Sequence, residues 1–281
     1  MRQHLLAAAI FLAATGPAAA YTAFILPQNF NPNDGEAAVQ AAYANTFFTP
    51  AVGLPADMKL LYPDGFEGGF SRVAVAGNAT ELSGDLSQWG TYRITTGELQ
   101  GAITTLVAAD GAWRPLAQGE VLPEGAQTST IQTITLADAY MSRGAPTRRV
   151  VDQPLGALAL VPVTHPNEVL AASGFQVELR FNGQPFPNMP IVLYDAGDAD
   201  TDQSTYFVTD AQGRATIALP QAGQYVIAAR HRADAPEGAG VDVRSYVTTL
   251  TFSAITAIPA YPEPPRTEPQ RQRRRGLDRG R

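Results

Sequence analysis

The sequence contains no cysteine, a single lysine and only three histidines in 281 residues. The lack of cysteine excludes a disulfide framework, thiolate metal sites, a cysteine nucleophile and a lipidated N-terminal cysteine. Charged residues are also scarce, at 16% of the chain against about 25% in ordinary soluble domains. After the first twenty positions no apolar run approaches the roughly 20 residues of a membrane helix, so we expect no transmembrane span in the mature chain.

Glycine and proline, by contrast, are abundant, with 25 and 22 residues respectively. They interrupt the chain too often for a helical bundle, which excludes an all-α fold. A hydrophobic content of 45% excludes a chain that is disordered throughout. The length fits one large or two ordinary globular domains.

Residues 1–20 have the pattern of an export signal. Arg2 is followed by the uncharged apolar run Leu5–Ala14, and small residues at Ala18–Ala20 precede Tyr21. The run is too short to cross a membrane, although an uncleaved anchor is the alternative interpretation. We therefore predict a signal peptide over 1–20, a mature chain that starts at Tyr21, and a periplasmic location.

The charges are unevenly distributed along the chain. Residues 21–260 carry 12 basic and 23 acidic side chains, so this body lacks the clustered cations that nucleic-acid binding requires. Residues 261–281 are rich in proline and arginine and are predicted to be a disordered basic tail. The tail could bind anionic groups of the envelope surface or fold back on the acidic body. Its candidate anion-binding residues are Arg271, Arg273, Arg274 and Arg275.

A period of two in hydrophobicity dominates the mature chain. In the segment 175–181, four apolar residues alternate with Gln176, Glu178 and Arg180, which predicts a strand with these polar side chains in water. Further strands in the second half are expected at Pro190–Tyr194, Thr205–Thr209, Arg214–Leu219, Gln224–Arg230 and Tyr246–Phe252. In the first half they are expected at Met58–Tyr62, Phe70–Ala76, Thr91–Thr95, Ile103–Ala108, Thr128–Leu136 and Ala157–Val163.

Short strands separated by turn residues at roughly ten-residue spacing are typical of antiparallel β-sandwiches. The segment Glu36–Asn45 fits a helix by propensity and a strand by alternation, and its surroundings favour a strand. We expect an all-β chain of two antiparallel β-sandwich domains, over 21–164 and 165–260. The proline-containing segment Val161–Asn167 is the expected hinge between them.

Several segments of the chain resemble the DUF4198 family, whose members are exported and similar to periplasmic components of nickel and cobalt uptake. The segments that carry this resemblance are Phe24–Pro27, Gly35–Tyr43, Gly90–Tyr92, Leu160–Pro162 and Thr249–Phe252. The second half also resembles transthyretin-like or Cna-B-type sandwiches, through Asn182–Pro185, Thr209–Ala215 and Ala222–Tyr225. Both resemblances imply architecture rather than chemistry, because these are turn and core residues.

The chain departs from the families that it resembles at two informative points. Many DUF4198 members start the mature chain with a histidine, which could bind nickel with the free amine, whereas here Tyr21 to Ala23 precede Phe24. That N-terminal metal site therefore cannot form. Cna-B-type modules of adhesins often join a lysine to an asparagine through an isopeptide bond, but Lys59 lies in the first half, so the second domain cannot contain this crosslink.

The remaining candidate metal ligands are two histidines and an acidic loop. His231 is expected on the same strand face as Tyr225, near the rim of the sandwich, either as a hydrogen-bonded rim residue or as a ligand. His165 either approaches a cleft between the domains or lies in solvent. Asp198, Asp200 and Asp202 could bind Ca²⁺, although Gln203 and Thr209 occupy the places of the EF-hand glycine and glutamate; a solvated acidic loop is the alternative.

No motif for catalysis is present: the chain has no G-x-S-x-G, no H-E-x-x-H, no P-loop and no G-x-G-x-x-G after a strand. We expect a non-catalytic binding or accessory protein of envelope uptake, with a metal ion or metal complex as cargo and nickel, cobalt or calcium as candidates. An envelope transporter or TonB-dependent receptor is the expected partner. The competing interpretation is a structural or protein-interaction module at the cell envelope.

Overall fold

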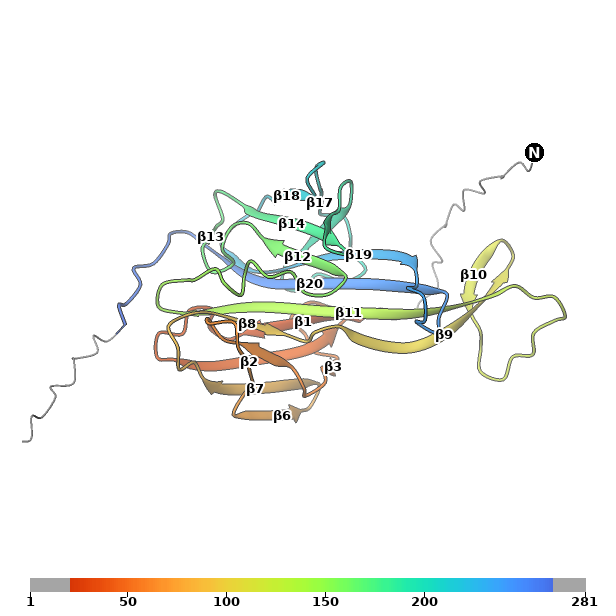
Figure 1. Ribbon diagram of the computed structural model, residues 1–281, viewed down its shortest axis with the longest axis horizontal. Helices are drawn as coiled ribbons and strands as arrows, with labels where there is room; N and C mark the ends of the chain where they lie inside the picture. The colour runs from red at the N-terminus through yellow and green to blue at the C-terminus, as the bar shows by residue number, and fades with distance from the viewer. Residues whose placement is uncertain (1–20, 265–281) are drawn as a thin grey trace, which may run out of the picture.

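The computed structural model describes residues 21–264, all of whose regular structure is β (Figure 1). The predicted signal peptide and the four tail arginines lie outside these residues. The strands are β1 (Thr22–Pro27), β2 (Glu36–Ala44), β3 (Val52–Gly53), β4 (Lys59–Leu61), β5 (Glu67–Gly68), β6 (Arg72–Ala76), β7 (Ala79–Asp85), β8 (Gly90–Thr95), β9 (Leu99–Ala109), β10 (Ala112–Pro115), β11 (Thr128–Arg143), β12 (Leu158–Pro162), β13 (Val169–Leu170), β14 (Phe175–Phe181), β15 (Gln184–Pro185), β16 (Pro190–Tyr194), β17 (Tyr206–Val208), β18 (Arg214–Ile217), β19 (Gly223–Asp234) and β20 (Val243–Ile255). The all-β prediction is thus confirmed, and β2 shows that alternation outweighs helix propensity in the 36–45 segment.

The strands form three sheets arranged as layers (Figure 1). An 11-stranded sheet runs in the order β17-β16-β19-β20-β11-β8-β4-β5 along its main path, with β9, β10 and β13 attached beside it. A 5-stranded sheet, β1-β2-β7-β6 with β3, covers one face, and the small sheet of β12, β14, β15 and β18 covers part of the other. The β-sandwich fold is therefore built twice against one shared sheet.

Strands from both sides of the expected domain boundary at Thr164 meet in the large sheet. Residues Ile131–Ala139 of β11 pair with Val243–Thr251 of β20, and this pairing is parallel. The sheet is therefore mixed rather than antiparallel throughout. Parallel neighbours far apart in sequence require long connections, and here the connection is the whole second sandwich.

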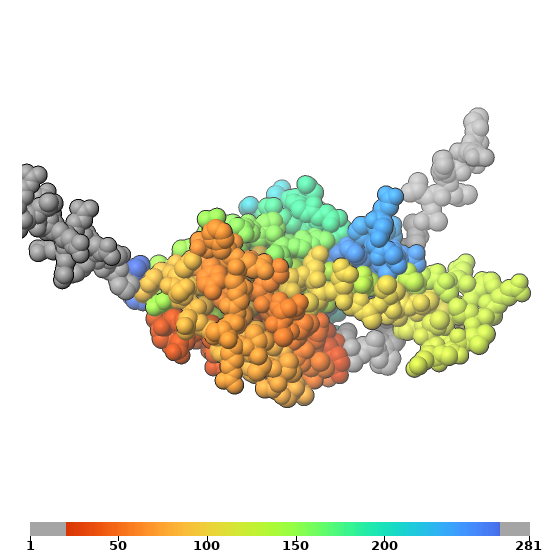
Figure 2. Space-filling view, turned by 60° about the horizontal axis from the view of Figure 1, so that its bottom comes forward, coloured from red at the N-terminus to blue at the C-terminus, as the bar shows by residue number. Residues whose placement is uncertain are grey.

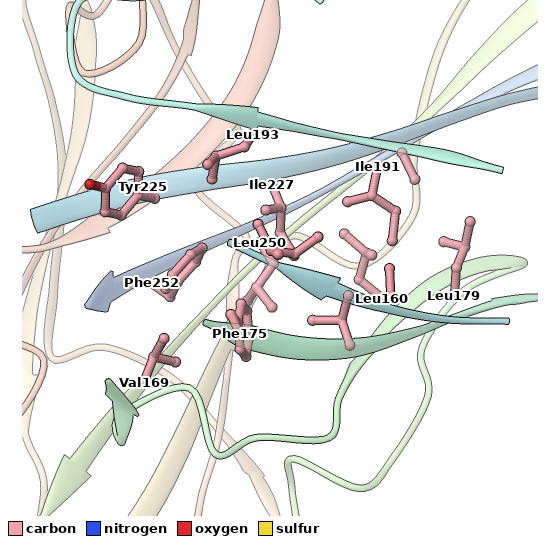
Figure 3. Close-up of a cluster of buried hydrophobic side chains, with 14 of the residues drawn as sticks. Leu160, Val169, Phe175, Leu179, Ile191, Leu193, Tyr225, Ile227, Leu250 and Phe252 are labelled. Atoms are coloured by element: carbon pink, nitrogen blue, oxygen red, sulfur yellow. The ribbon is translucent and has the colours of Figure 1, made fainter. Parts of the chain in front are cut away.

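β11 contributes to the cores on both faces of the shared sheet. Tyr140 packs into the core of the second half, while its neighbours Ala139 and Met141 pack into the core of the first half. Side chains alternate across a strand, so one strand buried on both faces supplies two cores at once. Figure 3 shows the second-half core, in which Phe175, Phe252 and Leu250 lie between the sheets.

One polar residue of β14 departs from its expected environment. Glu178 was expected in water, and that expectation is wrong, because the residue is only 8% exposed. Its carboxylate accepts a hydrogen bond from Nε of Arg180 at 2.7 Å and lies 3.8 Å from Nε of Arg214 on the neighbouring strand β18. Buried carboxylates require such partners, and only the pairing of β14 with β18 supplies the second one.

A hairpin formed by β9 and β10, with the following loop to β11, projects from the body (Figures 1 and 2). Ile103 on β9 and Val121 in the loop are exposed on this arm. Arg114 and Glu120 form an ion pair that closes the loop. In the described part of the chain, no helix is long and apolar enough to cross a membrane.

Candidate functional site: an acid-lined pocket

A pocket of about 460 Å³ opens at one end of the second sandwich. Its lining combines apolar side chains with two carboxylates and contains no basic residue. The lining residues are Leu193, Asp195, Asp198, Thr205, Ala218, Leu219, Pro220 and Tyr225. Concave sites with apolar walls and a few polar groups are the usual form of ligand sites in proteins.

The end of β16 sets the geometry of the acidic side of the pocket. Tyr194 ends the strand, and the chain turns through Asp195 to Asp198, closed by a hydrogen bond from the Asp198 N–H to the Asp195 carbonyl at 3.2 Å. Oδ2 of Asp198 accepts the Asp195 N–H at 2.7 Å, and Oδ1 of Asp195 accepts the Ala196 N–H at 2.7 Å. These bonds fix both carboxylates while leaving each the lone pairs of a second oxygen for a ligand.

The opposite wall is apolar and rigid. Tyr225 of β19 stacks on Phe252 with ring centroids 5.8 Å apart, and its hydroxyl donates to the Gln221 carbonyl at 3.0 Å. Figure 3 shows Tyr225 and Leu193 at the same end of the core. Burial, followed by the negative charge of Asp195, raises the pKa of Tyr225. The wall therefore stays neutral, and the negative charge of the lining is concentrated on Asp195 and Asp198.

Asp200 of the same loop turns away from the pocket and into the protein. It is buried, and its Oδ2 accepts a hydrogen bond from Thr22 Oγ1 at 3.2 Å. Arg230 donates to the same Thr22 hydroxyl and to the Tyr194 hydroxyl, each at 3.0 Å. Burial raises the pKa of Asp200 despite the bond from Thr22 and the charge of Arg230. Asp200 thus ties the acidic loop to β1.

The three aspartates proposed as calcium ligands are not brought together. Asp198 faces the pocket, Asp200 faces Thr22, and Asp202 accepts the Ser204 N–H at 2.9 Å, which holds its pKa below the usual range. Within residues 21–264 no group of three or more histidine, aspartate or glutamate side chains is placed to hold a metal ion. Alternate positions converge only if the loop curls around an ion, and this loop instead follows its backbone bonds to Asn45 and Phe47.

His165 is buried at 6% exposure, so the expectation of a solvent-exposed linker residue is wrong. Its Nε2 lies 3.0 Å from Thr91 Oγ1 and 3.1 Å from the Thr147 carbonyl, and its Nδ1 accepts the Asn167 N–H at 3.1 Å. Burial lowers its pKa. The residue belongs to a buried polar cluster between the two halves, and the segment expected to be a hinge is fixed by it.

His231 lies on β19 and packs edge-on against two rings, with centroids 4.7 Å from both Phe181 and Phe186. Its ring contacts place it on the same face of β19 as Tyr225, as predicted, because Phe181 and Phe186 pack against the core that contains Tyr225. Burial lowers its pKa. The ring surroundings are those of a packing residue rather than of a metal ligand.

Sequence reasoning found part of this site and missed the rest. The loop from Asp195 to Asp202 stood out by its charge pattern, but the pairing of Asp195 with Asp198 at the pocket was not predicted. The sequence pattern predicts ordinary core positions for Leu193, Leu219 and Tyr225. No local signal distinguishes a core residue from a residue in a pocket wall.

The first residue of the predicted tail, Tyr261, is attached to the body. Its hydroxyl donates a hydrogen bond to Glu168 Oε1 at 3.2 Å, and burial raises the pKa of Tyr261 to about 12.

The fold and the pocket together define a class, that of all-β sandwich proteins with an acid-lined pocket at a sheet end. Within this class the chain belongs to the DUF4198 family, described as a domain of unknown function, whose family model matches residues 18–233. The resemblance seen in the sequence is thereby confirmed at the level of the family.

Other comparisons add little to this assignment. No curated protein matches the sequence. Among solved structures, the chain is similar to a structure described as the D0-D1 domain of intimin, at 10% identity and a TM-score of 0.21, over 82% of this chain and 96% of that one. A TM-score of this size is too low to define a shared arrangement of strands.

Proposed function

We propose that this chain is a non-catalytic binding protein of the cell envelope that acts in uptake and holds a cationic cargo in the acid-lined pocket. The observation that carries the proposal is the pocket itself, in which two fixed carboxylates face an apolar wall with no basic residue among the lining. Its export to the periplasm and its hand-over of cargo to an envelope transporter or TonB-dependent receptor are parts of the same proposal.

The form of the pocket favours a metal complex over a bare ion as cargo. A bare Ca²⁺ takes six to eight oxygen ligands at about 2.4 Å, and nickel or cobalt prefers several nitrogen donors. Two carboxylates beside an apolar wall do not supply either set. A cation whose own ligands complete its coordination needs only opposite charge and a shaped wall, and both are present here.

Titration calorimetry on the chain starting at Tyr21 tests this proposal. The probes are Ni²⁺, Co²⁺ and Ca²⁺ salts and the inert complex hexaamminecobalt(III). We expect heat with the complex, and at least tenfold weaker binding in the double variant Asp195→Asn with Asp198→Asn. The matched control is Asp202→Asn, which removes a charge of the same loop outside the pocket. Absence of heat with all four probes, or equal binding by the double variant, would overturn it.

A second candidate function, protein interaction, is favoured by the projecting arm. The arm projects from the body (Figure 2), and its side chains Ile103 and Val121 are exposed, so a partner can contact them. If the arm binds a receptor, an envelope receptor co-purifies with the wild type and is lost from the Ile103→Asp variant. Ile258→Asp, at an exposed position outside the arm, serves as the control.

The basic tail is proposed to hold the protein at anionic envelope groups. Each arginine near such a surface contributes about 1 kcal/mol. Flotation with vesicles that contain anionic lipid should retain the chain that ends at Arg281 and release one that ends at Pro264. Equal retention of both would show that Arg271, Arg273, Arg274 and Arg275 do not serve this purpose.

A further inference from the structure

The strand β6 forms one edge of the 5-stranded sheet. Among residues 21–264 it pairs only with β7, through the register Arg72 to Ser83 and Ala76 to Ala79. Figure 1 shows no element beyond it, and the space-filling view places this part of the chain on the open surface. With respect to the described residues, its outer edge is therefore free to accept another strand.

The hairpin register determines which backbone groups face outward. A two-residue loop, Gly77 and Asn78, joins β6 to β7, so the closing pair Ala76 and Ala79 is hydrogen-bonded. Hydrogen-bonded and non-hydrogen-bonded pairs then alternate along the hairpin. It follows that Ala74 and Ala76 direct their N–H and C=O groups to β7, and that Val73 and Val75 direct theirs to the open edge.

β6 lacks the features that usually prevent pairing at an edge. It contains no proline, no lysine and no bulge, and its only charge is Arg72 at its start. Val73 and Val75, which share one face, are 38% and 68% exposed. A strand with outward hydrogen-bonding groups and exposed valines gains both hydrogen bonds and apolar burial when a matching strand is added.

We propose that β6 is a dimerisation edge, on which a second copy of this chain pairs antiparallel about a twofold axis through Ala74. In this register Val73 of each copy lies opposite Val75 of the other, and these two residues are the ones with outward N–H and C=O groups. The arrangement is self-complementary, as a twofold interface requires. It joins the two 5-stranded sheets into one continuous sheet.

The charges of the edge are compatible with this register. Arg72 of one copy falls opposite the small side chain of Ala76, so the two arginines are kept apart. Glu81 of β7 is paired with Ala74 and lies on the same face of the sheet. Only the small side chains of Ala74 and Ala76 separate it from Arg72 of the second copy. A peptide of another protein would need to match this pattern, whereas a second copy matches it by symmetry.

A contact of one strand pair is small, and interfaces below about 1,200 Å² are weak and transient. The proposed dimer is therefore expected to be weak.

The absence of cysteine from the chain allows a test of the register itself. The two copies of Ala74 face each other as a non-hydrogen-bonded pair, with Cα atoms about 4.5 Å apart, which is within the range for a disulfide. We expect the Ala74→Cys variant to form a disulfide-linked dimer under mild oxidation at high protein concentration. In the Val75→Cys variant each cysteine lies opposite Val73 of the other copy rather than opposite the second cysteine. This variant should form at least fivefold less disulfide-linked dimer.

Sedimentation velocity of the unmodified chain provides the second measurement. We expect a concentration-dependent monomer–dimer equilibrium that is lost in Val75→Pro, because proline removes an outward N–H without touching the β7 pairing. Val75→Thr, which keeps that N–H, should retain the equilibrium. A monomer at all concentrations, equal crosslinking of both cysteine variants, or an unchanged dimer in Val75→Pro would overturn the proposal.

Discussion

At the scale of single residues, the most informative positions are polar groups buried between the halves. His165, Thr91, Ser142 and Asn167 form a connected cluster in which Ser142 Oγ lies 2.8 Å from Thr91 Oγ1 and donates to Asn167 Oδ1 at 2.8 Å. Because Nδ1 of His165 accepts the Asn167 N–H, the proton of the neutral ring is on Nε2. This cluster is satisfied only while the histidine is uncharged.

We predict that acidification destabilises the protein through His165. Burial lowers its pKa in the folded state, with Arg148 adding to this effect and Glu168 and Asp152 opposing it. The unfolded chain therefore binds a proton that the folded chain does not, so stability falls as the pH drops below about 6.5. Urea midpoints measured between pH 7.5 and 5 check this.

The contributions of buried His165 and half-buried His231 can be separated by substitution. His231 has a lowered pKa for the same reason and contributes with the same sign. His165→Gln should reduce the decrease in stability on acidification, because it removes the contribution of His165. His231→Phe should also reduce this decrease, because it removes the contribution of His231. A decrease that is unchanged in both variants would contradict the prediction.

A buried ion pair supports a second prediction at this scale. Arg93 of β8 donates to Asp138 of β11 from Nε at 3.1 Å and from Nη2, and its Nη1 donates to the Gln153 carbonyl at 2.6 Å. Asp138→Asn leaves the guanidinium uncompensated, which should cost about 3–5 kcal/mol of the free energy of unfolding. Denaturation by urea measures this cost, and Glu67→Gln, at the exposed pair with Lys59, should change stability by under about 1 kcal/mol.

At the scale of elements, the turns decide how strands of the second sandwich meet. Gly213 lies in the turn between β17 and β18 at a φ of +72°, and its N–H donates to the Asp210 carbonyl at 2.9 Å. A Cβ atom here would lie 2.7 Å from both the Leu179 carbonyl oxygen and the Phe186 nitrogen. The glycine is therefore required by conformation and by space.

We predict that Gly213→Ala destabilises the protein by about 2–4 kcal/mol, since strain and a backbone clash act together. Gly183→Ala is the matched control, because its φ is +77° but nothing lies within 4 Å of an added Cβ. This variant should cost about 1 kcal/mol, the penalty of a left-handed conformation alone. Equal losses in thermal or urea unfolding would show that the clash is relieved by backbone movement.

At the scale of the whole molecule, the shared sheet makes the two halves depend on each other. β20 is paired on one side by β19 and on the other by β11, and Thr249 Oγ1 donates to the Ala23 carbonyl of β1 at 2.8 Å. Separation of the halves would expose the edge of β20 and one face of β19 that packs against β1 and β2. The halves are joined by packing as well as by pairing.

We therefore predict that residues 165–260 expressed alone do not fold cooperatively, whereas residues 21–264 unfold in a single transition. The reason is that the isolated half leaves Val192, Val226 and Ala228 uncovered. Circular dichroism during urea titration checks both fragments. A cooperative transition in the isolated half would show that its own sandwich core suffices.

Alternation in hydrophobicity determined the all-β class and most strands, because period two is a local property that each segment expresses by itself. Pro190–Tyr194 was predicted to the residue, and β20 only in its centre, since strand ends depend on neighbours. The burial of Glu178 and His165 could not be predicted locally, because one partner of each, Arg214 and Thr91 respectively, lies on another strand.

The sequence by itself determined that this chain is made of strands, and its segments pointed to the DUF4198 family. Only the tertiary structure decided that β11 and β20 lie side by side, that Asp195 and Asp198 share a pocket while Asp200 does not, and that β6 is left at an edge. The physical reason is that the central pairing, of β11 with β20, joins residues more than a hundred positions apart. Its outcome depends on the packing of all the layers together, which no single segment encodes.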